Sequence, residues 1–477
     1  MMLKQKVLSG TKWITIANMF RQVLQIISLI VFARLLTPTD FGTYAILMIF
    51  VGFLGMFTDM GTSAALIHRN RPSDKLLSSV FYFNVFIGFI LFILLSLLAM
   101  PISIFFERPE VKELLPTIAI NFVIVSFGVV QKALYEKAMN FKNLTIYESI
   151  AALFSVIAGI CSAIYGLGVY SLVIQTLVAS VILVFLMWYS SNWRPLWYFS
   201  IVEIKKIWAY TAHLSSFSII NYFSRNADNF LIGKFLGSSA LGVYSLAYKI
   251  MLYPLQNISQ VLIRILFPAF AQIQKDNEKF KNAYLRVIFF IALVSFPIMT
   301  GLMATADILV DVLFGNKWEG LAVILFILAP VGMMQSIVTT TGSIFMAKGN
   351  TKEMFKIGTI NSIVTLGALT IGVLFGVEGV AYSYLIANIV MLYPNLLTAW
   401  RQIGLSVQEG LKEIMPIFII SFLMGVLVML FGQILTDFIE NQSLKLILMV
   451  LCGFVVFLGL VRLKYGAYKV LISELKK

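Results

Sequence analysis

The chain has 477 residues, of which 60% are hydrophobic and only 12% are charged, and its formal net charge is +14. This composition excludes a soluble globular protein and indicates an integral membrane protein. The basic residues stand between apolar runs rather than in one long basic segment, so they do not indicate a nucleic-acid-binding arm.

Fourteen apolar stretches of about 20 residues follow one another, each bounded by charged residues or by Pro, Gly and Asn. They cover residues 13–36, 42–66, 77–104, 114–136, 144–165, 168–190, 207–232, 241–265, 284–306, 321–346, 355–375, 378–400, 412–436 and 444–464. No connection between them is long enough for a soluble domain. The expected fold class is therefore an all-α polytopic membrane protein with about 14 transmembrane helices.

The 36 lysines and arginines are unevenly distributed over the connections. Most of them fall on the side of the membrane that holds the N-terminus, and few fall on the other side. Because basic residues concentrate on the cytoplasmic side, we expect both termini to be cytoplasmic. The N-terminus shows no cleavable signal peptide, so the first span is expected to serve as its own insertion signal.

The first span carries polar residues on one face. Asn18, Arg21, Gln22 and Gln25 fall at positions i, i+3, i+4 and i+7, the spacing of one side of a helix. An arginine at this depth costs about 2.5–3.5 kcal/mol on insertion scales. We therefore expect Arg21 to face a cavity, and a cationic cavity in a membrane favours an anionic substrate.

An internal repeat divides the chain. Residues 34–44 match residues 234–244 at an offset of 200, and residues 166–172 resemble residues 376–383. Six spans separate the copies, and an even number gives both halves the same orientation. The expected domains are an N-terminal lobe over 1–200, a C-terminal lobe over 201–405 and an extra helix pair over 406–477. We expect two pseudo-symmetric six-helix lobes with the substrate site between them.

The second lobe begins as the first one does. In the seventh span, Asn221, Arg225 and Asp228 share one face, and Asn226 is adjacent to them. Lys249 lies on the polar stripe of the eighth span. The equivalent helices of the two lobes thus each carry a cation inside the membrane, which is the strongest functional signal in the sequence.

Several segments resemble a known family. Residues 32–44 (FARLLTPTDFGTY) and 59–67 (DMGTSAALI) are similar to the opening of Wzx-type polysaccharide flippases. The second lobe of that family resembles residues 221–233, 244–249, 254–259, 266–270 and 314–318. The resemblance covers nearly the whole chain and is strongest to the colanic-acid and teichuronic-acid exporter branch of the multidrug/oligosaccharidyl-lipid/polysaccharide exporter superfamily.

This resemblance implies a two-lobe fold with a central cationic cavity. It also implies transport of an undecaprenyl-pyrophosphate-linked oligosaccharide from the cytoplasmic to the outer leaflet of the bacterial inner membrane, for surface polysaccharides such as O-antigen or exopolysaccharide. In relatives the last two helices help to form a groove for the lipid tail. The expected partners are the lipid-linked oligosaccharide, membrane lipid and polysaccharide polymerase machinery, with no nucleic acid, and the expected state is a monomer.

The site hypothesis places two arginines on the pyrophosphate. Arg21 and Arg225 grip the head group from opposite lobes, because a planar guanidinium can bind phosphate oxygens in a bidentate way. Lys249 adds a third charge. Arg264, near the cytoplasmic end of the eighth span, is either a portal residue that attracts phosphate or a positive-inside anchor. The expected contacts to sugar hydroxyls come from Asn18, Gln22, Gln25, Asn221 and Asn226.

The alternative is that each arginine has only a structural role. Arg21 would then pair with Asp59, and Arg225 with Asp228, which is one helical turn away. The two aspartates either set the field around the arginines or bind a coupling ion, Na⁺ or H⁺. With two histidines and two cysteines in the chain, we expect no metal site and no cofactor.

Two other functions compete with the flippase interpretation. A cation-coupled multidrug or small-metabolite exporter could use the same fold, but arginines in both lobes argue against a cationic cargo. A membrane-bound enzyme would need carboxylates or histidines in a sizeable loop at a membrane face. The chain has no such loop and no histidine cluster, so we expect no enzymatic activity.

Overall fold

The structure is a computed structural model that describes residues 2–69, 72–205, 222 and 226–465. Side chains are outside that description for residues 2–15, 257–269, 271–272 and 465. Every regular element among the described residues is a helix, as the apolar runs predict. The chain divides into two compact units, Met1–Gly242 (unit 1) and Val243–Lys477 (unit 2).

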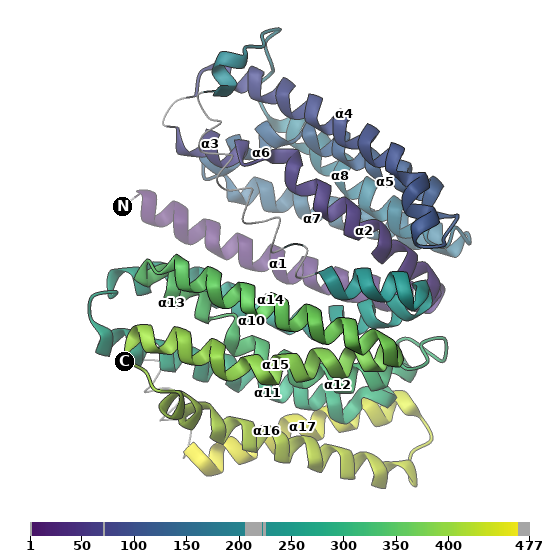
Figure 1. Cartoon of the computed structure of the whole chain (residues 1–477), viewed down its shortest axis with the longest axis vertical. Helices are drawn as coiled ribbons and strands as arrows, with labels where there is room; N and C mark the ends of the chain where they lie inside the picture. Colours follow the sequence, from purple (N-terminus) through teal and green to yellow (C-terminus); the bar gives the residue numbers. More distant parts are fainter. Residues whose placement is uncertain (1, 70–71, 206–221, 223–225, 466–477) are drawn as a thin grey trace. The chain divides into compact units, whose positions relative to one another are not determined.

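Among its described residues, unit 1 holds eight labelled helices, a helical stretch over 226–235 and the start of α10. The helices are α1 (Met2–Leu35), α2 (Pro38–Asp59), α3 (Thr62–His68), α4 (Asp74–Phe105), α5 (Val111–Ser126), α6 (Val129–Lys137), α7 (Phe141–Ile164) and α8 (Tyr170–Ser190). In Figure 1, α4, α5 and α8 run side by side, and α1 lies along α7. The contact of α1 with α7 brings the polar face of the first span against a second helix.

Among the described residues of unit 1, two of the expected spans are broken. The second span is interrupted after α2, where Met60 and Gly61 take left-handed backbone conformations with φ of 45° and 79°. Asp59 Oδ1 accepts hydrogen bonds from the Thr62 hydroxyl at 2.7 Å and the Ser63 amide at 2.8 Å. The aspartate therefore stabilises the first turn of α3, where a negative charge is favourable. The fourth span is bent by 43° between α5 and α6.

Unit 2 continues α10 and adds the remaining helices. These are α10 (Gly237–Gln272), α11 (Asn277–Leu313), α12 (Leu321–Val338), α13 (Thr341–Lys348), α14 (Thr351–Gly372), α15 (Gly376–Trp400), α16 (Val407–Thr436) and α17 (Gln442–Tyr465), with short 3₁₀ turns at Val373–Phe375 and Arg401–Ile403. The last two helices pack on α11 (Figure 1). Their shared core consists of Ile308, Met424, Val428, Leu435 and Met449.

The number of spans agrees with the expected fold class. Ten helices among the described residues are long and apolar enough to cross a membrane, or eleven if the bent pair α5 and α6 forms one span. One of these ten is the segment Thr351–Ile403, which contains both α14 and α15 and therefore two of the expected spans. The expected span 241–265 lies on α10. The expected span 207–232 falls largely outside the described residues.

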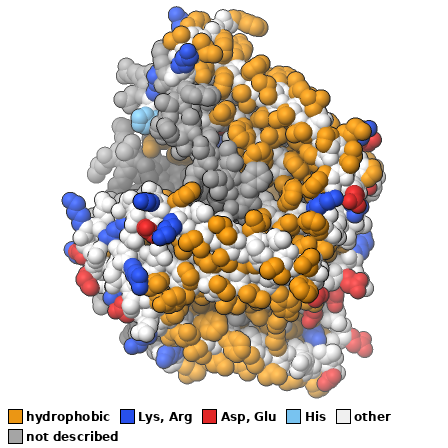
Figure 2. All heavy atoms as spheres, viewed as in Figure 1, with side chains coloured by type: hydrophobic (Ala, Val, Ile, Leu, Met, Phe, Trp, Pro, Cys, Tyr) orange, Lys and Arg blue, Asp and Glu red, His pale blue; other side chains and the backbone are white. Residues whose placement is uncertain are grey.

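The surface of unit 2 carries the charge pattern of a membrane-spanning body. Figure 2 shows a band of apolar side chains across its helices, with charged side chains of both signs gathered at the ends of the band. The end where α13 lies and α14 begins holds Lys348, Lys352 and Lys356, and the opposite end holds Asp437 and Glu440. Such an apolar band between charged ends fits a bilayer.

The two copies of the repeated segment meet within unit 1. A Cβ atom added at Gly42 of α2 would lie only 1.6 Å from the carbonyl oxygen of Ser238 on α10. A Cβ added at Gly242 would lie 1.8 Å from the carbonyl oxygen of Pro38. Ser238 and Gly242 stand 200 residues after Pro38 and Gly42, so the contact is reciprocal. The starts of the equivalent helices thus cross at a point where only glycine fits.

The start of α11 is fixed by a charged cap. Asp276 Oδ1 accepts the amide hydrogen of Lys279 at 3.1 Å, and Asp276 Oδ2 lies 3.0 Å from the Lys279 ammonium. The hydrogen bond from the Lys279 backbone and then that from its side chain lower the pKa of Asp276 from its ordinary value of 3.8. A carboxylate at this position satisfies helix amides that otherwise have no partner in the helix.

This cap predicts a pH dependence. A group whose pKa is lowered by folding contributes stability above its unfolded pKa, and the contribution is lost as the pH falls through the folded value. We therefore expect Asp276→Ala to lower the thermal midpoint in detergent at neutral pH. The difference from the unchanged protein should shrink below about pH 4. At neutral pH, the thermal midpoint of Asp276→Asn, which keeps an acceptor oxygen without the charge, should lie between those of Asp276→Ala and the unchanged protein. A difference that is constant with pH would contradict the role of the charge.

Candidate functional site

Arg21 of α1 is held by partners on two helices. Its Nη1 donates to the Glu148 carboxylate of α7, forming an ion pair, and its Nη2 donates to the side-chain oxygen of Asn18. Glu148 thus takes the place that the structural alternative gave to Asp59. Within the described part of the chain, Arg21 and Asp59 form no ion pair, since Asp59 caps α3 instead. That alternative pairing was wrong.

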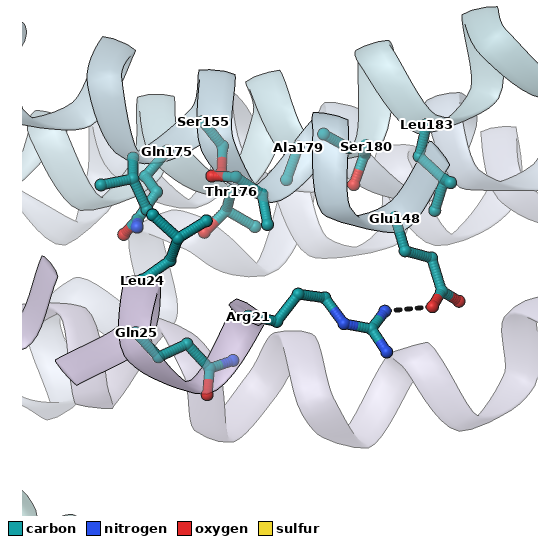
Figure 3. Close-up of a pocket in the computed structure, with 13 residues that line it drawn as sticks. Arg21, Leu24, Gln25, Glu148, Ser155, Gln175, Thr176, Ala179, Ser180 and Leu183 are labelled. Atoms are coloured by element: carbon teal, nitrogen blue, oxygen red, sulfur yellow. Dashed lines mark hydrogen bonds and ion pairs between the residues drawn. The ribbon is translucent and has the colours of Figure 1, made fainter. Parts of the chain in front are cut away.

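The ion pair lies in the wall of a cavity inside unit 1. The cavity has a volume of about 400 Å³ and is bounded by α1, α7 and α8 (Figure 3). Its lining consists of Arg21, Leu24, Gln25, Glu148, Ala151, Ala152, Ser155, Val156, Gln175, Thr176, Ala179, Ser180 and Leu183. In Figure 3 the Arg21 and Glu148 side chains point toward one another.

The sequence of α7 explains how three helices can surround this space. Its lining residues fall at 148, 151, 152, 155 and 156, the spacing of one helix face. Three of them are alanine or serine, which leave room beside α1 and α8. One turn further, a Cβ at Gly159 would lie 2.7 Å from the Phe32 ring and 3.0 Å from the Gln175 Cβ. The helices therefore close tightly beyond the cavity.

Hydrogen bonds join the helices at that same end. The Gln175 side-chain amide donates to the Ser28 hydroxyl of α1 at 2.9 Å. The Tyr44 hydroxyl of α2 lies 2.8 Å from the Thr176 hydroxyl, also a hydrogen bond. Because polar groups inside a membrane need partners, these bonds hold α8 against α1 and α2. Thus one end of the cavity is fastened by neutral groups and the other by an ion pair.

Part of the predicted polar face of α1 lies at this cavity. Arg21 and Gln25 line the cavity, and Asn18 contacts Arg21. Gln22 is half-buried on the same helix but is not in the wall that the described residues form. The arginine and two of its three polar neighbours thus belong to one site.

The predicted residues of the second lobe are placed less completely. Asn221 and Arg225 lie outside the described residues, as does the side chain of Arg264. The Asn226 side chain donates to the Tyr222 carbonyl at 2.9 Å, and the buried Asp228 carboxylate accepts the Asn229 amide at 2.8 Å. Lys249 is exposed on α10. The joint grip of Arg21 and Arg225 on a substrate therefore stays a prediction.

Sequence reasoning missed the groups that α7 and α8 contribute. Glu148, Ser155, Gln175, Thr176 and Ser180 were not among the candidate residues. Glu148 did carry a signal, because a carboxylate within the apolar run 144–165 is as costly as the arginine in the first span. The two charges compensate each other across the helix contact.

Comparisons with known proteins place the chain in a family. The sequence model of a family described as "Polysaccharide biosynthesis protein" matches residues 31–323. The chain is 28% identical over 437 residues to the lipopolysaccharide biosynthesis protein WzxC of Escherichia coli (strain K12), with 89% of each chain covered. It is 28% identical over 478 residues to the teichuronic acid biosynthesis protein TuaB of Bacillus subtilis (strain 168), with 98% of this chain and 97% of the relative covered.

Solved structures share the fold. The lipid II flippase MurJ, in an inward closed conformation, matches 96% of this chain and 99% of its own with a TM-score of 0.77 at 20% identity. An inward-facing multidrug resistance transporter of the MATE family matches 83% of this chain and 98% of its own, with a TM-score of 0.63 at 17% identity. The expected fold class is therefore confirmed. Since the family match covers more than half of its length, the chain belongs to the polysaccharide biosynthesis protein family.

Proposed function

We propose that the chain moves an undecaprenyl-pyrophosphate-linked oligosaccharide repeat unit from the cytoplasmic to the outer leaflet by alternating access. Membership in the polysaccharide biosynthesis family supports this function. The names of the relatives support it as well, since they include lipopolysaccharide and teichuronic acid biosynthesis proteins and a succinoglycan biosynthesis transport protein. MurJ, described as a lipid II flippase, has a similar fold.

The observation that carries the proposal is the guanidinium of Arg21 in the wall of a cavity among apolar helices. A pyrophosphate head group leaves water for the membrane interior only if cations receive it. Arginine binds phosphoryl oxygens through a planar set of donors. Neutral amides and hydroxyls on α1, α7 and α8 offer partners for sugar hydroxyls.

The remaining parts of the proposal concern orientation, partners and the driving force. The unequal distribution of Lys and Arg favours cytoplasmic termini in the bacterial inner membrane. Transport rather than catalysis is expected, and the expected state is a monomer. Polymerase machinery would receive the exported unit. A Na⁺ gradient, an H⁺ gradient or the membrane potential would drive the cycle. Asp59 and Asp228 would either bind the coupling ion or set the field around the arginines, and Arg225, Lys249 and Arg264 would be further cationic contacts.

A deletion strain tests the function. Cells that lack the protein are expected to accumulate a lipid-linked oligosaccharide on the cytoplasmic side and to lose the surface polysaccharide. Mass spectrometry of extracted lipids identifies the precursor, and a plasmid copy of the unchanged gene should reverse both effects. Normal surface polysaccharide without any accumulated precursor would contradict the proposal.

The second candidate is a cation-coupled exporter of drugs or small metabolites, favoured by the likeness to the MATE fold. That likeness covers less of this chain than the likeness to MurJ does. The same deletion strain separates the two functions. If the protein is a flippase, its deletion should leave drug susceptibility unchanged. If it is an exporter, its deletion should leave the lipid-linked precursor unchanged and lower the concentration at which a drug inhibits growth.

A further inference from the structure

The ion pair between Arg21 and Glu148 is accessible from the cavity. The two side chains keep 23% and 24% of their surface exposed, and both line the cavity wall. The two terminal nitrogens of Arg21 contact different partners, Glu148 and Asn18. A guanidinium has five N–H donors, so these two contacts leave donors available. A third group that enters the cavity can therefore reach the arginine.

The wall of the cavity is electrically balanced before any ligand arrives. Among the described lining residues, Arg21 and Glu148 are the charged ones, and the others are apolar or neutral polar side chains. A phosphoryl group that enters this space brings negative charge next to Glu148. Two anions beside one cation repel each other, so the phosphoryl group and the carboxylate compete for the guanidinium.

We propose that Glu148 is an internal competitor of the cargo's phosphate for Arg21. The carboxylate occupies the guanidinium while the cavity is empty, an entering phosphoryl or pyrophosphoryl group displaces it, and its return helps to release the cargo. This inference rests on the proposed function, because it takes a lipid-linked phosphate as the ligand of Arg21. No covalent bond is made or broken in the exchange.

Competition also explains why a transporter would place a carboxylate at its binding arginine. An unpaired guanidinium inside the membrane would bind an anion tightly and release it slowly. With Glu148 present, the net affinity is the difference between two charge-assisted contacts. A transporter has to release its cargo on the far side, so a reduced affinity favours turnover.

A purely structural ion pair would behave differently. If Glu148 served only to hold α7 against α1, its neutralisation would weaken the helix contact and disturb the cavity. Affinity for an anion would then stay the same or fall. The affinity for pyrophosphate therefore distinguishes the two roles in a way that protein stability alone does not.

The test compares matched variants of the purified full chain in detergent. Isothermal titration with inorganic pyrophosphate is carried out on the unchanged protein, on Glu148→Gln and on Glu110→Gln, which removes the same charge from an exposed position in unit 1. Glu148→Gln is expected to bind on the order of tenfold more tightly, and Glu110→Gln should bind like the unchanged protein. The double variant Arg21→Ala/Glu148→Gln should lose the gain.

A second comparison separates free pyrophosphate from lipid. Nanodiscs that contain a polyprenyl diphosphate should show the same gain for Glu148→Gln, and this variant should restore less surface polysaccharide to the deletion strain because its cargo is held. A gain for free pyrophosphate alone would overturn the assignment to the lipid-linked cargo.

The outcome that overturns the competition itself is an unchanged or weaker affinity in folded Glu148→Gln. If that variant does not fold, Glu148→Asp replaces it, because a shorter carboxylate reaches Arg21 less well and should give a smaller gain. No gain in folded Glu148→Asp would equally overturn it. The deletion strain tests the proposed function separately. If no lipid-linked precursor accumulates there, the proposed function is contradicted, but the measured affinity for pyrophosphate still tests the competition.

Discussion

Arg21→Ala is expected to abolish the ability of the protein to restore surface polysaccharide to a strain that lacks it. The change removes the cation that lines the cavity of unit 1, and it leaves the Glu148 carboxylate without its partner between apolar helices. Removing one member of a fully buried ion pair typically costs about 3–5 kcal/mol, and the loss at this half-buried pair should be smaller. Polysaccharide on the cell surface and protein in the membrane fraction are the quantities to measure.

Loss of the protein and loss of transport have to be distinguished. In Arg21→Ala/Glu148→Gln no carboxylate is left unpaired, so the amount of folded protein should recover while transport stays absent. Arg21→Lys keeps the charge but not the planar set of donors and should restore transport only in part. Normal polysaccharide from the double variant would show that Arg21 does not bind the cargo.

Gly42→Ala is expected to have the second large effect, a strong loss of folded protein. The added Cβ would lie 1.6 Å from the carbonyl oxygen of Ser238, which belongs to the backbone and cannot rotate away. The starts of α2 and α10 would have to move apart. Overpacking typically costs about 1–3 kcal/mol, and a clash with backbone lies at the upper end. Size-exclusion profiles and thermal midpoints in detergent measure the loss.

The matched control is an alanine at an unobstructed helical glycine. A Cβ added at Gly358 of α14 would meet no described atom within 4 Å outside the adjoining part of its own helix, so Gly358→Ala should be neutral or slightly stabilising. Gly242→Ala should behave like Gly42→Ala, since its Cβ would lie 1.8 Å from the Pro38 carbonyl oxygen. If Gly42→Ala were as stable as Gly358→Ala, the close crossing of the two helices would be refuted.

Much of the fold was predictable because a bilayer imposes length and polarity on each span. Apolar runs predicted where helices lie, including the two helices of Thr351–Ile403. The break after α2 was not predicted. It depends on Met60 and Gly61 in left-handed conformations and on Asp59 as a local acceptor, which are details of a few residues inside an apolar run.

The candidate site was predictable on one helix only. Helical spacing placed Asn18, Arg21 and Gln25 together, because residues of one face are set by the chain itself. The partner Glu148 stands 127 positions away from Arg21, and a single sequence carries no register between distant helices. The aspartate chosen as a partner lay close in the sequence but is used by its own turn.

The reciprocal crossing of α2 and α10 limits how the protein can change. Both contact positions, Gly42 and Gly242, already carry the smallest amino acid. A larger side chain on one helix therefore cannot be compensated by a smaller one on the other. Second-site suppressors of Gly42→Ala must therefore arise elsewhere, at residues that reset the approach of the two backbones. A selection for suppressors of Gly42→Ala would therefore identify residues outside the crossing that determine the spacing of the two helices.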